Sequence, residues 1–351
     1  MKASQLWFTR PGEVEIRQFV LPELRANEVL VRTLYSAISA GTEMLVYRGQ
    51  LPAELSLDAT LTVHSQKPVY PIQYGYAAVG QIEQVGNELD ASLIGKHVFA
   101  FQPHASHFVC ALDDLIIVPD MTDPLDAAFL ANTETAVSLV LDSKPLLGEK
   151  IVVLGLGVVG LLVTAILSRF PLGELHVLDK IQQRRNLASK FSVYSAGSPD
   201  SITDVDNLKS RLGKQEITNG ADLIFELTGS PEALNLAIEL CGYSGRIVVG
   251  SWYGTKTAEL KLGSSFHRNR IQIISSQVST IAPELRGRWD KARRFTTAWQ
   301  MIEKIRPHTL ISHKIPFNSA MDAYQLLDKS PDQTIQVVFD YNNQNVTGGF
   351  D

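Results

Sequence analysis

Hydrophobic and polar positions change their spacing along the 351-residue chain. In the first 120 residues, short apolar or alternating runs are separated by glycine and proline, a pattern typical of strands and turns. These runs lie at 29–35, 78–85, 97–101 and 113–119. Thr122 or Asp123 then caps an expected helix with Pro124 in its first turn. The pattern predicts a mostly β region at the start of the chain.

Strand-like and helix-like segments alternate from about residue 123 to residue 282, as in parallel sheets covered by helices. The expected strands are 151–154, 174–178, 222–226, 246–249 and 271–275, with an amphipathic helix at 231–240. Further on, a helix at 288–304 precedes strands at 311–315 and 335–340, with a helix at 318–328 between them. This last region is too small for its own core. We therefore predict a discontinuous first domain, 1–122 with 283–351, around a second domain at 123–282.

The strand at 151–154 runs directly into a G-x-G-x-x-G turn, Gly155 to Gly160. Gly155 permits a tight turn, Gly157 lets the backbone approach a pyrophosphate, and Gly160 lets the following helix pack closely. Leu156, Val158 and Val159 lie between these glycines and start the helix, whose free N–H groups favour phosphate. Asp179 ends the next strand and can accept hydrogen bonds from ribose hydroxyls. The segment predicts a dinucleotide site.

The type of dinucleotide depends on the residues after the second strand. Asp179 repels a 2′-phosphate and favours NAD, whereas Lys180 and Arg184 could support NADP or simply form a solvated helix face. Ligands bind beyond the carboxyl ends of parallel strands. The expected cofactor-lining residues beyond the later strands are Thr228, Gly229, Gly250, Ser251 and Trp252.

Composition restricts the classes of function. The net charge of −5 argues against nucleic acid or an anionic membrane as partner. Two cysteines do not support a disulfide scaffold, and no secretion signal or long apolar span is visible, so we expect a cytoplasmic protein. A basic run at 286–294 is interpreted as a solvated helix face; holding an anionic group of a substrate is the alternative.

Three segments carry a family resemblance: 36–43, 74–80 and 245–250. With the glycine turn, they occur in the order found in the medium-chain dehydrogenase/reductase superfamily, which the whole chain resembles. The resemblance implies an α/β fold with a GroES-like, mostly β catalytic domain and a Rossmann domain with a doubly wound parallel sheet. It also implies hydride transfer with NAD or NADP, a small-molecule substrate and a homodimer.

The chain departs from this family at the expected zinc ligands. Ala40 and Tyr76 stand where the zinc-dependent branch has Cys and His, and two distant cysteines cannot form a four-cysteine structural site. We therefore expect no zinc. The alternative is an unusual catalytic zinc site made by Glu43, His64 and Glu134.

Without zinc, another group must donate to the substrate oxygen. Tyr76 is the candidate acid, because a phenol can donate a proton to a developing alkoxide. Thr42 assists it, since the resemblance places its hydroxyl in the proton relay. Tyr76 could instead merely fill the space left by the metal. Glu43 and Glu134 are further catalytic candidates, although each could be a helix-end or surface carboxylate.

The sequence thus predicts a zinc-independent oxidoreductase acting on a small alcohol/carbonyl pair. Two alternatives remain open. One is a reductase of activated C=C bonds, of the enoyl or quinone type. The other is a dinucleotide-binding protein without catalysis.

Overall fold

The computed structural model describes residues 1–51, 69–213 and 219–342 of the chain. Within these ranges, no helix is both long and apolar enough to cross a membrane. Backbone contacts divide the chain into two compact units, one of residues 1–131 with 306–351 and one of residues 132–305. His64 and the C-terminal end, 343–351, lie outside the described residues.

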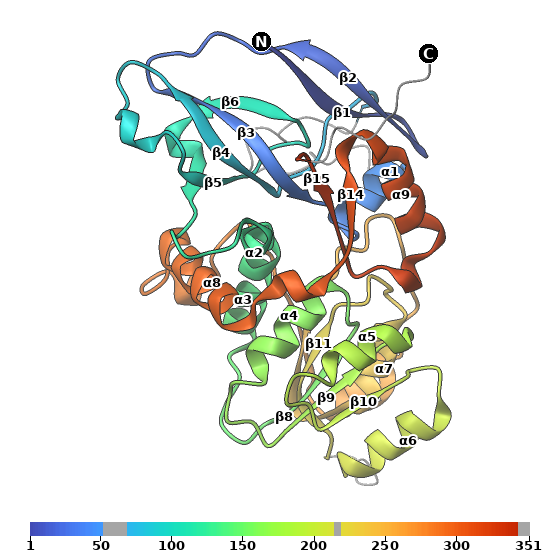
Figure 1. Cartoon of the computed structure of the whole chain (residues 1–351). Helices are drawn as coiled ribbons and strands as arrows, with labels where there is room; N and C mark the ends of the chain where they lie inside the picture. The colour runs from blue at the N-terminus through green and yellow to red at the C-terminus, as the bar shows by residue number, and fades with distance from the viewer. Residues whose placement is uncertain (52–68, 214–218, 343–351) are drawn as a thin grey trace. The chain divides into compact units, whose positions relative to one another are not determined.

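The first unit is built on a seven-stranded sheet (Figure 1). Its main path runs β14 (Ile311–Pro316), β15 (Gln336–Asp340), β3 (Glu28–Ala37), β4 (Ala78–Val85), β5 (His97–Ala100) and β7 (Leu115–Ile117), and β6 (His107–Ala111) also pairs with β3. The C-terminal strand β15 is antiparallel to β3, so the end of the chain completes the sheet of its first part. The C-terminal region thus contributes a strand to the sheet of the β region.

Other elements of the first unit surround an apolar core. The hairpin of β1 (Lys2–Arg10) and β2 (Glu13–Val20) forms a separate two-stranded sheet, while α1 (Thr42–Tyr47) and α9 (Ala320–Lys329) contact each other. Buried residues of β1, α1, α9 and β15 form one core cluster. The hydrophobic pattern did not predict β1, β2 or β6. In β2 the inner and outer positions are only weakly segregated, since four of its eight positions are neither buried nor fully exposed.

The second unit has a six-stranded, entirely parallel sheet. The strand order is β10 (Ser195–Gly197), β9 (Glu174–Leu178), β8 (Lys150–Leu154), β11 (Ala221–Glu226), β12 (Cys241–Val249) and β13 (Gln272–Ser275), as Figure 1 shows in part. The order reverses between β8 and β11, and in such sheets the crevice at the reversal binds ligands. Its helices include α4 (Val158–Leu167), α5 (Gln182–Ala188), α6 (Ile202–Arg211), α7 (Ala233–Leu240) and α8 (Lys291–Ile305).

The boundaries between the units, 131/132 and 305/306, lie C-terminal to those that the sequence predicts at 122/123 and 282/283. The helix expected at residue 123 is broken into α2 (Pro124–Ala127), capped by Asp123, and α3 (Leu130–Ser143), most of which belongs to the second unit. Helix α8 also belongs to the second unit because it packs on α4.

Candidate functional site

The glycine turn after β8 is closely packed at two of its glycines and open at the third. Gly155 has a positive φ of 91°, and a side chain there would meet the backbone of Leu227 at 2.6 Å. A Cβ on Gly160 would lie 2.0 Å from the carbonyl oxygen of Gly155, so α4 packs directly on the turn. A Cβ on Gly157 would meet nothing within 4 Å, and this residue begins α4 without a side-chain cap. Space and free N–H groups therefore coincide at one helix N-terminus, as phosphate binding needs.

Asp179 lies beside this turn at the end of β9. Its carboxylate accepts hydrogen bonds from the N–H groups of Leu156, at 2.6 Å, and Ile181, at 2.8 Å. Arg184 lies 4.0 Å from the same carboxylate, whereas Lys180 pairs with Asp200 at 3.2 Å. The acid predicted to contact ribose is thus fixed against the glycine turn, with only one of the two candidate cations close to it.

The loops after β11 and β12 are tied together at the same edge of the sheet. The buried Glu226 carboxylate accepts hydrogen bonds from the N–H and hydroxyl of Thr228 and, at 2.5 Å, from the hydroxyl of Tyr253. The Ser251 hydroxyl accepts from the N–H of Gly229 at 2.9 Å. Burial and the neighbouring carboxylate raise the pKa of Tyr253, so its phenol remains a donor. Tyr253 therefore binds these loops together, while Trp252 stays 41% exposed.

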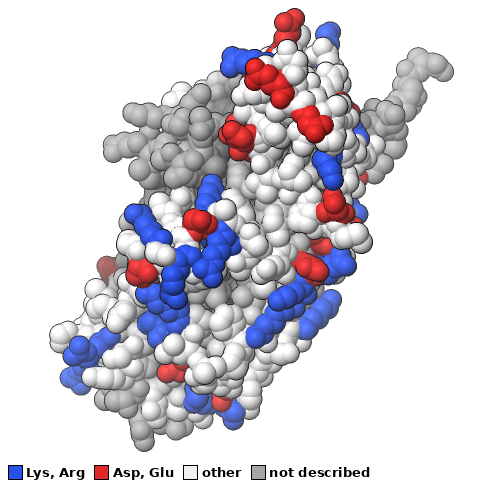
Figure 2. Space-filling model, turned by 90° about the vertical axis from the view of Figure 1, so that its left-hand side faces the viewer, with Lys and Arg blue, Asp and Glu red and all other residues white. Residues whose placement is uncertain are grey.

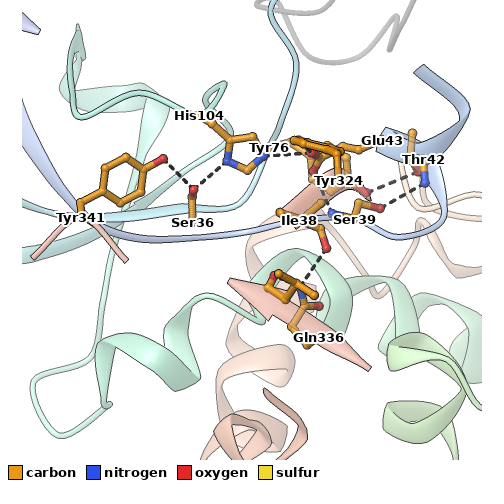
Figure 3. Close-up of polar contacts among 11 residues, drawn as sticks. Ser36, Ile38, Ser39, Thr42, Glu43, Tyr76, His104, Tyr324, Gln336 and Tyr341 are labelled. Carbon is orange, nitrogen blue, oxygen red and sulfur yellow. Dashed lines mark hydrogen bonds and ion pairs between the residues drawn. The ribbon is translucent and has the colours of Figure 1, made fainter. Parts of the chain in front are cut away.

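In the first unit, a fully buried carboxylate, Glu43, organises the start of α1 (Figure 3). One carboxylate oxygen accepts the N–H of Ser39 at 2.8 Å. The other accepts from His104 Nε2 at 2.9 Å and from the Tyr324 hydroxyl at 2.6 Å. Ser39 also accepts the N–H of Thr42 at 3.3 Å through its hydroxyl, an arrangement close to a capping box. The surface position considered for Glu43 is wrong, because these donors compensate the cost of burying it.

The hydrogen bonds continue from His104 to residues that the sequence pattern did not indicate. His104 Nδ1 lies 2.6 Å from the hydroxyl of Ser36, which lies 2.9 Å from the hydroxyl of Tyr341. Burial is the largest cause that raises the pKa values of Tyr324 and Tyr341, which keeps both phenols protonated. The segment 104–107 contains two histidines just before and at the start of β6. This was the sequence signal that could have pointed to His104.

Tyr76 and Thr42 are brought together, as the resemblance implied. The Tyr76 hydroxyl donates to Thr42 Oγ1 at 3.4 Å, and both side chains are partly buried (Figure 3). Tyr76 packs against the core cluster of the first unit, and its ring lies edge-on to that of Tyr74 at 6.0 Å. A partly exposed phenol with an adjacent hydroxyl can exchange hydrogen bonds with a bound substrate.

These residues do not fit a zinc ion. Ala40 has no ligating atom, and Glu43 is committed to three donors. Among residues 1–51, 69–213 and 219–342, no group of three or more His, Cys, Asp or Glu is placed to hold a metal. We therefore derive no step through a metal.

Glu134 lies in the second unit, and its carboxylate pairs with a cation rather than facing solvent. Arg294 donates to it from Nε at 3.0 Å and from Nη2 at 2.7 Å, and both side chains are buried. Burial raises the pKa of Glu134 against the opposing effect of Arg294. The prediction that Glu134 lies at the surface is thus wrong. The prediction that the run 286–294 is a solvated face is wrong for one of its residues, Arg294, which is buried.

The other cations of this run are exposed. The face that carries α8 is turned to the viewer in Figure 2, where Lys and Arg gather; the exposed cations of the run are Arg286, Arg288, Lys291 and Arg293.

Comparison with known proteins extends this picture. Residues 158–298 match a family described as zinc-binding dehydrogenase. D-guloside 3-dehydrogenase of Escherichia coli K12 is 23% identical over 349 residues, which cover 95% of this chain and 99% of that protein. These matches support the resemblance of the chain to the medium-chain dehydrogenase/reductase superfamily. It is an oxidoreductase.

Solved structures share the fold of this chain. The 2R,3R-butanediol dehydrogenase of Bacillus subtilis superposes with a TM-score of 0.76 at 16% identity, covering 96% of this chain and 99% of that one. An alcohol dehydrogenase of E. coli CFT073, solved with NADH, gives 0.75 at 18% identity, covering 97% and 99%. The predicted combination of a GroES-like domain with a Rossmann domain is confirmed.

Proposed function

We propose that this oxidoreductase moves a hydride between NAD(H) and a secondary alcohol or ketone of a small polyhydroxylated substrate, without zinc. The observation that carries the proposal is the hydrogen bond between Tyr76 and Thr42, at the position where the zinc-dependent branch keeps a ligand. The name of the guloside dehydrogenase supports a sugar-like hydroxyl as the reacting group.

Bound nicotinamide supplies the hydride for reduction and accepts it in oxidation. In reduction, the Tyr76 phenol gives its proton to the substrate oxygen; in oxidation, the ionised phenol receives the hydroxyl proton. In the structure the phenol donates to Thr42 Oγ1. When the phenol turns its proton to the substrate oxygen, the Thr42 hydroxyl can donate to the phenol oxygen in return. Glu134, which is paired with Arg294, takes no part in this proton transfer.

The glycine turn and Asp179 support the choice of NAD over NADP. Both oxygens of the Asp179 carboxylate lie where they accept N–H groups of the turn and of the following loop, close to the position of the adenosine ribose in this fold. A 2′-phosphate there would meet a negative charge. Similar solved structures hold either NADH or NADP, so the choice of NAD rests on Asp179.

Replacing Tyr76 tests the proposal. We expect Tyr76→Phe to lower kcat about 10²-fold, because general acid–base catalysis contributes about 10²–10⁴-fold. The assay follows NADH formation with methyl D-guloside or 2R,3R-butanediol and NAD⁺. The affinity for NADH, measured by tryptophan fluorescence, should not change, because the substitution removes only the hydroxyl that the proposal assigns to the substrate oxygen.

Tyr74→Phe is the matched control, since Tyr74 precedes Tyr76 by two residues and its side chain is buried. It should retain kcat, and dialysis of the wild type against a chelator should leave kcat unchanged. Full activity of Tyr76→Phe would refute the role of Tyr76, and chelator-sensitive activity would refute zinc independence. Reduction of the C=C bond of 2-cyclohexenone, without reduction of the carbonyl group of any substrate, would favour a C=C reductase. NADH binding without any turnover would favour a non-catalytic protein.

A further inference from the structure

His104 touches both segments that carry the proposed acid–base pair. It comes from the segment between β5 and β6, and its side chain is fully buried. On one side, its Nε2 lies 2.9 Å from the carboxylate of Glu43, the residue after Thr42. That carboxylate also fixes Ser39, whose hydroxyl accepts the N–H of Thr42.

On its other side, His104 packs on the backbone directly before Tyr76. Gly75 has a φ of 125°, and a Cβ built on it would lie 2.8 Å from Cδ2 and 2.9 Å from Nε2 of His104. Only glycine leaves room for the imidazole there. The ring is thus held between the backbone that carries Tyr76 and the carboxylate that holds the Thr42 turn (Figure 3).

The hydrogen bonds fix the orientation of the ring. A carboxylate can only accept, so His104 Nε2 carries the hydrogen, and in the neutral ring Nδ1 accepts from Ser36. The hydroxyl of Tyr341 lies 2.9 Å from the hydroxyl of Ser36. The ring of Phe339 lies edge-on to the imidazole, with 5.0 Å between the ring centroids. The imidazole therefore has a partner at each nitrogen and an aromatic neighbour beside it.

Within the described residues, the hydrogen bonds that link this network to Thr42 do not form a proton path to Tyr76. Between Glu43 and Thr42 it passes through the N–H groups of Ser39 and Thr42, and backbone amides do not give up protons at this step. His104, Ser36 and Glu43 are fully buried, which also keeps substrate from a serine–histidine–carboxylate arrangement. The role that remains for His104 is to position other residues.

We propose that His104 is a positioning residue that sets the spacing between the Tyr76 and Thr42 hydroxyls. It fixes Glu43 on one side and the Gly75 backbone on the other, so its loss loosens the 3.4 Å contact. The inference rests on the proposed function of Tyr76. A misplacement of about 1 Å at a reacting group can cost about 10²-fold in rate.

Two amide substitutions of His104 test this. His104→Gln can place an amide near the position of Nε2 and donate to Glu43, whereas His104→Asn reaches only toward Ser36. We expect His104→Asn to lower kcat about 10- to 100-fold with little change in KM or in NADH affinity. His104→Gln should recover most of this loss. His107→Gln, three residues away, is the control and should keep wild-type kcat.

A double-mutant cycle with Tyr76→Phe separates positioning from general destabilisation. If His104 acts through Tyr76, His104→Asn should cause no further loss of kcat in the Tyr76→Phe background. If His104→Asn lowered kcat equally in the wild-type and Tyr76→Phe backgrounds, the inference would be overturned. The same holds if His104→Asn and His104→Gln lowered kcat equally. Neither result would affect the role of Tyr76. A Tyr76→Phe variant with full kcat would instead refute the proposed function itself.

If His104→Asn does not fold, Tyr324→Phe provides the same comparison, because it removes only a hydroxyl that donates to Glu43. Its loss of kcat, expected to be about tenfold, should likewise vanish in the Tyr76→Phe background. A loss that persists there would also overturn the inference.

Discussion

Single residues act here through the partners that the fold gives them. Glu43 and Glu134 are both acidic residues of helices, yet one is held by His104 and Tyr324 and the other by Arg294. Neither partner follows from the local sequence. Asp179 differs, because its contacts with Leu156 and Ile181 come from the strand–turn–helix segment to which it belongs.

Asp179 should therefore control the choice of dinucleotide. We expect Asp179→Ser to weaken NADH binding about tenfold, since a hydrogen bond to a charged group contributes about 1.5–3 kcal/mol. NADPH should bind relatively better, because the repulsion of its 2′-phosphate is removed. Fluorescence titration with both cofactors measures this ratio. Asp206→Ser, on α6, is the control; an unchanged ratio in Asp179→Ser would contradict the assignment.

Among the elements, α8 shows how one helix combines an exposed and a buried charge. Arg293 is exposed, and its guanidinium lies over the ring of Trp289 at 4.3 Å. The next residue, Arg294, is buried and donates to Glu134 on α3 and to the carbonyls of Val278 and Thr280. A basic run in sequence is thus divided by the helix into a solvated part and a structural part.

Removing the buried arginine should destabilise the second unit. We expect Arg294→Met to lower the free energy of unfolding by about 3–5 kcal/mol, because the carboxylate of Glu134 is left buried and unpaired. Arg293→Met should change it by less than about 0.5 kcal/mol. Urea unfolding followed by circular dichroism gives both values. Equal effects of the two substitutions would show that the Arg294–Glu134 pair contributes little.

At the scale of the whole molecule, two sheets of different construction serve two tasks. The parallel sheet of the second unit offers the glycine turn at its reversal point, between β8 and β11. The mixed sheet of the first unit is completed by β14 and β15, which brings Tyr341 to Ser36. The oxidoreductase thus has a cofactor-binding unit and a unit that carries the proposed acid.

We also propose a homodimer formed through the edge of the parallel sheet, where β13 is the last strand. Analytical ultracentrifugation should give twice the mass of one chain. Ile273 of β13 is 38% exposed, and Ile273→Glu should shift the protein toward the monomer. Val20→Glu, at an exposed position of β2, should remain dimeric. A wild-type monomer, or an Ile273→Glu dimer of unchanged stability, would contradict the proposal.

The sequence by itself determined the local features. Strand, glycine turn, helix and terminal acid lie within 150–179, so periodicity and glycine spacing specify β8, α4, β9 and the dinucleotide site together. The pairing of Tyr76 with Thr42 followed only from the family resemblance.

Only the tertiary structure decided what surrounds the proposed acid. His104 and Ser36 are 68 residues apart, Glu43 and Tyr324 are 281 apart, and Ser36 and Tyr341 are 305 apart. Hydrophobic patterns have periods of a few residues and report which face is buried, but not which distant side chain will meet it. A buried polar group needs a partner, and the chain topology alone determines which one it finds.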